Sequence, residues 1–147
     1  MKKRWIISVV ILLLLGAAVY VVSIKSDHAF SAQPEGITMW VEEGSVTADG
    51  LTYTIENTLE KKICWGSKYF IEKKIFGIWI PLTFTEDMLI TLPLISLEPG
   101  ETSSRDAFWT SHWTPGKGSY RIVKEVWMYG EELTEDPYYL LALFEVQ

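Results

Sequence analysis

The sequence of 147 residues predicts an all-β domain of seven or eight strands, preceded by one N-terminal transmembrane helix. Three observations support this fold class. Residues 5–24 carry no charge, residues 37–146 contain short runs in which apolar and polar side chains alternate, and Pro, Gly and Asp separate these runs. Alternation with a period of two is typical of β-strands, and the turn residues mark where strands end. We therefore expect no helix after Ile24.

The first element is the uncharged segment Trp5–Ile24, which is long enough to span a bilayer. A helix of this length, at about 1.5 Å of rise per residue, extends about 30 Å, and the hydrocarbon core has the same thickness. Basic residues at positions 2–4 precede the segment. The positive-inside rule therefore predicts a cytoplasmic N-terminus and an extracytoplasmic C-terminal part, in a single-pass protein of the cell membrane.

A signal peptide that is cleaved after export begins in the same way, and this alternative stays open. Signal peptides need an apolar stretch of only about 7 to 15 residues before a cleavage site with small residues. Val21-Val22-Ser23 and Ala29-Phe30-Ser31 are acceptable sites, although neither is of the Ala-x-Ala type. We predict a signal anchor over residues 1–25, a tether over 26–36 and a domain over 37–147, and cleavage would make this domain a secreted protein.

The exported part is strongly acidic. All 19 acidic residues but only 9 of the 13 basic residues follow Lys25, which gives this part a formal charge of −10. Such an average charge repels nucleic-acid phosphates and anionic lipid head groups. The sequence therefore predicts neither nucleic acid nor anionic lipid head groups as partners of the exported part.

Cys64 is the only cysteine, so no disulfide can form within the chain. It lies between Ile63 and Trp65 in an apolar run. A cysteine in such a run behaves as a small apolar residue, and we expect Cys64 to be buried.

The predicted strands are spaced about 8 to 12 residues apart, which is typical of a sandwich or a barrel. They cover residues 37–42, 51–56, 63–74, 78–80 after a hairpin turn at Gly77, 90–97, 102–110, 120–128 and 138–146. Pro93 indicates an edge strand, whereas the last strand is apolar on both faces and is expected to be central. Lys124 interrupts an apolar face, and we expect it at a rim where its amine reaches water.

Tyr120 begins the penultimate strand after the turn at Pro115-Gly116. Greek-key sandwiches place a tyrosine corner at this point, with the hydroxyl bonded to a backbone group nearby. An ordinary core tyrosine is the alternative. Together with export, the corner favours an immunoglobulin-like β-sandwich of seven or eight strands.

Several motifs extend this interpretation. They are Gly50-Leu51-Thr52, Tyr69-x-Ile71-Glu72-Lys73-Lys74, Trp79-x-Pro81, Leu97-x-Pro99-Gly100-Glu101, Pro115-Gly116 before Gly118-x-Tyr120-Arg121-Ile122-Val123-Lys124, and Tyr138-Tyr139 with Phe144. With these motifs the chain resembles the bacterial immunoglobulin-like domains of exported Gram-positive proteins. The resemblance implies a β-sandwich outside a bacillus-like cell and no catalytic activity. The chain is more distantly similar to the bacillary intracellular proteinase inhibitor, with which it shares the Pro-Gly-Glu turn and the tyrosine corner. It differs from this intracellular inhibitor in having an export signal.

Candidate catalytic groups are few. His28 lies in the tether, so a Ser/His/Asp hydrolase would have to combine His112 with Asp106 and Ser103, Ser104 or Ser111. The other possible arrangement is a pair of Cys64 and His112. None of these residues lies in a nucleophile elbow or has the spacing of another catalytic motif. The sequence therefore predicts a protein that is not an enzyme and has no catalytic residues.

Carboxylates gather at Glu42-Glu43 and in the loop over residues 131–136. Calcium takes six to eight oxygen ligands, but neither segment has the Asp-x-Asp-x-Asp-Gly spacing of a preformed calcium loop. We expect solvated acidic loops, with no metal and no cofactor.

Six tryptophans follow the predicted anchor, and a core of this size cannot easily bury all of them. Trp40 alternates with polar neighbours, and Trp109 and Trp113 flank a loop that contains His112. These four residues are a possible patch for a protein or carbohydrate ligand. The alternative is that the rings cover the open ends of the sandwich.

These observations predict a membrane-anchored extracytoplasmic immunoglobulin-like module of the cell envelope, which binds another envelope protein or a carbohydrate or has a structural role. An exported protease-inhibitor-like domain is the alternative function, implied by the more distant similarity.

Overall fold

A computed structural model describes residues 33–82, 94–109, 113–130 and 137–147, and in these residues the chain is all β. Its nine strands are β1 (Ile37–Val41), β2 (Gly50–Asn57), β3 (Ile63–Trp65), β4 (Phe70–Ile75), β5 (Ile78–Pro81), β6 (Ile95–Leu97), β7 (Thr102–Phe108), β8 (Gly118–Met128) and β9 (Tyr138–Val146). The predicted anchor, with both cleavage sites and His28, lies outside the described residues. In the part that is described, no helix is long and apolar enough to cross a membrane.

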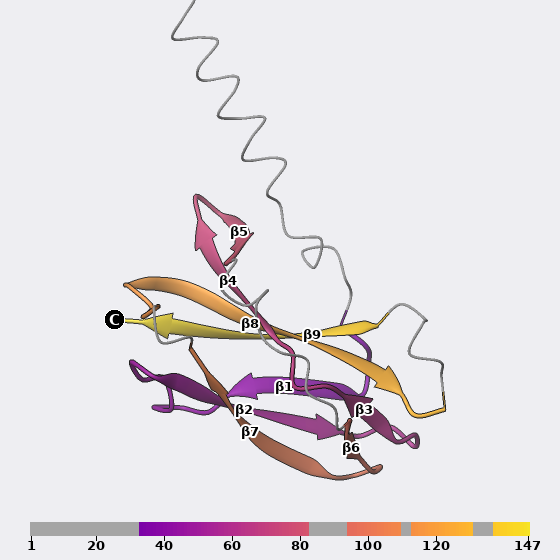
Figure 1. Ribbon diagram of the computed structural model, residues 1–147. Helices are drawn as coiled ribbons and strands as arrows, with labels where there is room; N and C mark the ends of the chain where they lie inside the picture. Colours follow the sequence, from indigo (N-terminus) through magenta and orange to yellow (C-terminus); the bar gives the residue numbers. More distant parts are fainter. Residues whose placement is uncertain (1–32, 83–93, 110–112, 131–136) are drawn as a thin grey trace, which may run out of the picture.

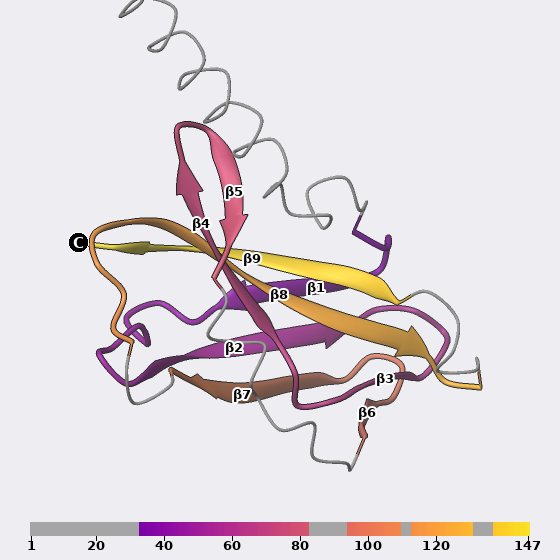
Figure 2. The same ribbon diagram turned by 45° about the horizontal axis from the view of Figure 1, so that its top comes forward.

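The strands form two antiparallel sheets that face one another (Figures 1 and 2). The first sheet has the order β1-β2-β7, and the second has the order β5-β4-β8-β3-β6 with β9 paired to β8. This arrangement confirms the prediction of an all-β sandwich. The hairpin around Gly77 is confirmed as β4 and β5. Of the edge strand predicted over 90–97, β6 lies at an edge of the described sheet, whereas residues 90–93 with Pro93 lie outside the described residues.

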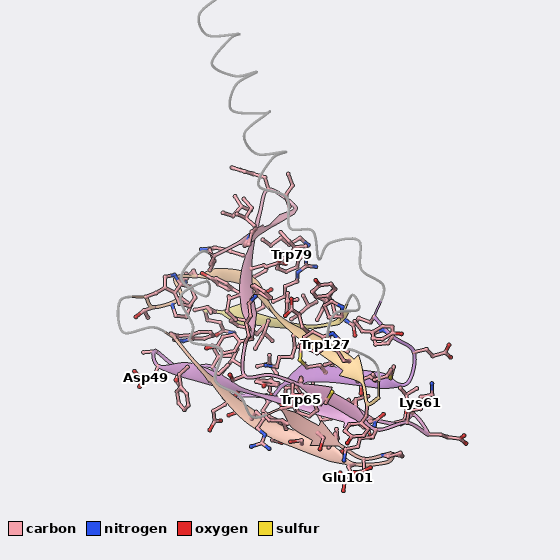
Figure 3. All side chains as sticks on the ribbon, turned by 45° about the vertical axis from the view of Figure 1, so that its right-hand side comes forward. Asp49, Lys61, Trp65, Trp79, Glu101 and Trp127 are labelled. Atoms are coloured by element: carbon pink, nitrogen blue, oxygen red, sulfur yellow. The ribbon has the colours of Figure 1, made fainter. Side chains whose placement is uncertain are left out.

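The core lies between the sheets, because alternating residues of facing strands point inward. In β1 the inward residues are Ile37 and Met39, and the alternation that predicted this strand is confirmed. Trp65 belongs to this core and is completely buried, and Figure 3 marks its place in the sandwich. Cys64 is also buried, in agreement with its apolar neighbours.

The predicted strand over residues 63–74 is divided into β3 and β4, which explains nine strands instead of eight. Both segments pair with β8 on the same side. Between the pairs Cys64–Trp127 and Phe70–Val123, the segment that joins β3 to β4 has two residues more than β8, so its backbone forms a bulge that includes Gly66 to Lys68. Such a bulge leaves carbonyl groups without ladder partners.

Lys124 satisfies these carbonyl groups. Its amine donates hydrogen bonds to the carbonyl oxygens of Gly66 and Lys68, the second at 2.6 Å. The side chain is completely buried, so the expectation of a lysine at a rim is wrong. The bulge provides acceptors inside the sandwich that no alternation pattern reveals.

The tyrosine corner is confirmed. The Tyr120 hydroxyl donates to the carbonyl oxygen of Gly116 at 2.6 Å, four residues upstream, and the ring stacks on Phe144 at a centroid distance of 5.4 Å. Both rings lie in the core. The bond fixes the turn that leads into β8.

The expectation of a central last strand is wrong. Among the described residues, β9 pairs with β8 along one side only, and its other side borders β1 without strand pairing. Leu140, Ala142 and Phe144 face the core, whereas Leu143 on the opposite face is 69% exposed. The outward apolar residues of β9 therefore lie on a surface.

Candidate functional site

The outer face of the first sheet gathers hydroxyl, carboxylate and aromatic side chains. Strand alternation turns one set of residues outward, and the register aligns Trp40 with Thr54 and Ser104, Thr52 with Asp106, and Gly50 with Phe108. We call this set, together with Glu42 at the end of β1, the polar face. Its two exposed rings are Phe108, which is 66% exposed, and Trp40, which is 38% exposed.

Hydrogen bonds fix the side chains of the polar face. The Trp40 indole donates to Glu42 Oε1 at 3.0 Å, and the Thr54 hydroxyl donates to the same oxygen. Thr54 also shares a hydrogen bond of 2.7 Å with Ser104, and Thr52 donates to Asp106 Oδ1 at 2.7 Å. Because a carboxylate offers about four acceptor positions, both carboxylates keep capacity for a ligand's hydroxyl groups.

A shallow depression of about 230 Å³ opens at the end of the polar face where β1 connects to β2. It is lined by Ser45, Thr47, Asp49, Gly50, Leu51, Thr52, Asp106 and Phe108. Figure 3 shows Asp49 at this end of the sandwich, opposite the end that carries Lys61. The depression therefore combines one exposed ring with several groups that donate or accept hydrogen bonds.

The loop that borders the depression is held in place from within. The Trp109 indole donates to the Thr47 carbonyl at 3.0 Å, and the Trp109 amide donates to the Asp49 carbonyl at 2.8 Å. The Thr47 hydroxyl accepts from the amide of Asp49 at 3.2 Å, and the Ser45 hydroxyl accepts from that of Thr52 at 3.1 Å. A ligand that binds here would meet a preformed surface, which lowers the ordering cost of binding.

The structure separates the residues of the predicted patch. Trp40 lies on the polar face, as its alternation indicated. Trp109 is only 7% exposed, and its ring stacks on that of Phe144 at a centroid distance of 6.1 Å. The prediction of an exposed ring at this position is therefore wrong. Trp113 is half-buried and meets Trp109 edge to face at 5.2 Å, and His112 lies outside the described residues. Trp109 thus contributes to the site only by positioning the loop.

Phe108 was missed by the sequence analysis, although the signal was present. Ala107 and Trp109 are buried, so the residue between them points outward by the same alternation that identified Trp40. The Tyr69 hydroxyl donates to the Phe108 carbonyl and fixes the backbone under the exposed ring. This contact joins the second sheet to the polar face.

The candidate hydrolase residues have other roles in the described part of the chain. Asp106 accepts from Thr52, Ser104 is bonded to Thr54, and Ser103 is paired with Ile55 on the inward-facing register. Among the described residues no three His, Cys, Asp or Glu side chains are placed to hold a metal ion. The acidic loop over residues 131–136 lies outside them.

A second polar cluster lies between the sheets around Lys124. Its ammonium lies 5.9 Å from the centre of the Tyr53 ring, and burial lowers the pKa of Lys124 from 10.5 to about 7, against a small opposing effect of Glu125. Burial also raises the pKa values of Tyr53 and Tyr69 to about 12. Because Lys124 is completely buried, this cluster has a structural role.

The bacterial Ig-like domain family matches residues 33–139, which is most of the chain and nearly all of the sandwich. No curated protein matches the chain. The matched residues include Trp40, Phe108 and the bulge beside Lys124.

Proposed function

Because the chain belongs to the bacterial Ig-like domain family, we propose that it is a non-enzymatic module of the cell envelope, held at the membrane by residues 5–24, and that its polar face binds carbohydrate. Domains of this family suggest a structural or binding role rather than a catalytic one. The fold carries no chemistry of its own, so the function has to be argued from the surface.

The observation that carries the proposal is the placement of Trp40 and Phe108 on one face. Their partners on β2, Thr54 and Gly50, are four residues apart, which corresponds to about 14 Å along the strand at about 3.4 Å per residue. Thr52 and Asp106 lie between them. Exposed rings stack against the C–H faces of sugar rings, and the hydroxyl and carboxylate groups between them bind sugar hydroxyls.

The charge of this face favours an uncharged ligand. Glu42, Asp49 and Asp106 border the site and repel phosphate or carboxylate groups of a ligand. Neutral sugar units satisfy the same acceptors through their hydroxyl groups without this repulsion. We therefore infer a neutral envelope polysaccharide in preference to an anionic wall polymer.

A pull-down assay tests the proposal. The detergent-solubilised chain is mixed with protein-free envelope polysaccharide, and the fraction that sediments is measured. Trp40→Ala and Phe108→Ala should each weaken binding at least about fivefold, since an aromatic contact contributes about 1 kcal/mol beyond its buried area. Leu143→Ala is the matched control, because it removes an exposed apolar side chain from the other sheet. Equal affinity of the parent and both aromatic variants would overturn the proposal.

The localisation is a separate part of the proposal. Residues 1–25 hold the chain in the cell membrane with the domain outside, unless cleavage near Ser23 or Ser31 releases it as a secreted protein. Mass spectrometry of the mature N-terminus distinguishes the two forms, because a released chain begins near Ile24 or Ala32. Inhibition of an exported protease stays a prediction that rests on the more distant similarity alone.

A further inference from the structure

The β4–β5 hairpin extends beyond the rest of the sandwich, as Figures 1 and 2 show. Its strands close at the pair Ile75–Ile78, with Phe76 and Gly77 as a two-residue turn. The Phe76 side chain is completely exposed, and Ile75 is partly exposed. We call Ile75, Phe76, Gly77 and Ile78 the hairpin tip.

Neither local conformation nor packing accounts for phenylalanine at this position. Phe76 and Gly77 have φ angles of 49° and 82°, as a type I′ turn requires, and such turns favour Asn or Asp before Gly because other side chains are disfavoured at positive φ. The exposed ring gains no burial in return. An apolar ring in a disfavoured conformation at a projecting turn points to a contact outside the domain.

The charges on the hairpin differ from the average of the exported chain. Lys73 and Lys74 both lie on β4, and the only carboxylate of the hairpin strands, Glu72, is buried and paired with Arg121. Lys74 is aligned with Trp79, whose ring lies 5.5 Å from its ammonium. Figure 3 shows Trp79 below the hairpin tip on the outer side of the second sheet.

We propose that the hairpin tip inserts into the head-group region of the membrane that holds the chain. From the tip downward the hairpin presents apolar side chains, then a tryptophan beside a lysine, and then a second lysine. Membrane-interface segments have this order, because indole rings lie at head-group level and lysines extend their amines to phosphate groups. The inference rests on the proposed anchoring.

The predicted tether permits this contact. Its eleven residues, 26–36, extend at most about 36–40 Å at about 3.3–3.6 Å per residue. The hairpin is thereby kept close to the bilayer, and the second contact becomes intramolecular. Repulsion between lipids and carboxylates elsewhere on the domain is screened beyond about 8–10 Å, whereas the lysines act at the head groups themselves.

A bilayer fits the hairpin tip better than a protein partner does. The tip is a convex turn with one fully exposed ring. A specific protein interface buries about 800 Å² on each partner, which a single turn does not supply. Insertion into a bilayer does not need a surrounding surface that is complementary to a partner.

Site-directed spin labelling tests the inference on the full chain in vesicles of phosphatidylcholine, with and without phosphatidylglycerol. Phe76→Cys carries a nitroxide in place of the ring, and Tyr129→Cys carries one at an exposed aromatic position outside the hairpin. Cys64 is buried, and the parent chain treated with the same reagent is the control for labelling at this thiol. We expect the label at position 76 to be protected from a water-soluble nickel chelate and accessible to oxygen, and the label at 129 to show the reverse.

Two results would overturn the inference. One is equal exposure of both labels to the chelate in both kinds of vesicle. The other is dipolar broadening at position 76 that disappears on dilution with unlabelled chain, since it would place a second copy at the tip. Lys73→Glu with Lys74→Glu should abolish the protection at position 76 and leave the label at 129 unchanged.

Flotation of the same samples separates the two proposals. A chain that does not float with the vesicles overturns the anchoring and, with it, the inference. A chain that floats while its label at position 76 stays in water overturns the hairpin contact alone.

Discussion

Lys124 Nζ donates a hydrogen bond to the carbonyl oxygen of Lys68 at 2.6 Å, inside the sandwich. The bond crosses from β8 to the bulge between β3 and β4, and the same amine donates to Gly66. A neutral amine has two N–H groups, which equals the number of carbonyl acceptors here. Loss of one proton therefore removes the charge from the core and keeps both hydrogen bonds.

This arrangement predicts a pH-dependent stability. The pKa of Lys124 is about 7 in the folded chain and 10.5 in the unfolded chain, so the unfolded chain binds more protons between these values. The free energy of unfolding should rise with pH by about 1.4 kcal/mol per pH unit from pH 7 toward 10.5, and below pH 6 the contribution of Lys124 should no longer change with pH. The measurement is urea unfolding at several pH values for the parent and Lys124→Met, because their difference cancels the other groups.

The control for this measurement is Lys117→Met, which removes an exposed lysine from the turn before β8. The difference in free energy of unfolding between Lys117→Met and the parent should stay constant with pH. A constant difference for Lys124→Met as well would show that the amine is charged throughout this range.

The tyrosine corner predicts a loss of stability without a change of fold. Tyr120→Phe removes the hydroxyl that donates to Gly116 and leaves the stacked ring in place. We expect the free energy of unfolding to fall by about 1 kcal/mol, because the hydrogen bond between the hydroxyl and the Gly116 carbonyl is lost. Urea unfolding measures this free energy. The control is Tyr138→Phe, which alters a partly exposed tyrosine and should change the free energy of unfolding little. Equal stability of both variants would contradict a role of the hydroxyl.

The fold was predictable because alternation and turn residues act locally. Ile37 and Met39 point inward as their spacing requires, and the Pro-Gly turn correctly placed the corner at Tyr120. Lys124 was not predictable, because its acceptors come from a bulge some 60 residues away in sequence. A charged residue in a strand indicates a solvent-exposed face only when no neighbouring segment offers hydrogen-bond acceptors to its side chain inside the fold.

The candidate site was predictable in part. Trp40 was identified from its polar neighbours, but Phe108 follows Ala107 and precedes Trp109, and three apolar residues in succession hide the alternation. The burial of Trp109 depends on its long-range contacts with Phe144 and Thr47. Such contacts are set by the assembled sheets and leave no trace in the local pattern.

The buried ion pair predicts strong coupling between two strands. Glu72 on β4 lies directly opposite Arg121 on β8, both side chains are almost completely buried, and Arg121 also lies 4.7 Å from the Trp79 ring. Removing one partner leaves a buried charge, so Glu72→Met and Arg121→Met should each lower the free energy of unfolding by about 3–5 kcal/mol. The double variant should be more stable than either single variant, since no charge remains.

A double-mutant cycle from urea unfolding gives the coupling free energy directly. The idea fails if the two losses are additive, because additive losses mean that neither charge depends on the other.

Gly50 links the stability of the sandwich to the polar face. A Cβ atom at this position would lie 2.3 Å from the Ala107 carbonyl oxygen and 3.0 Å from the Phe108 Cα, so Gly50→Ala must push β7 away from β2. We expect a loss of about 1–3 kcal/mol, as for other overpacked sites, with weaker polysaccharide binding because Phe108 moves. Gly116→Ala is the matched control, since no atom lies within 4 Å of its Cβ position, and it should be neutral or stabilising by up to about 1 kcal/mol. If Gly50→Ala and Gly116→Ala have the same free energy of unfolding and the same affinity for the polysaccharide, β7 moves away from β2 without loss of stability. The close approach of β2 to β7 then does not position the Phe108 ring.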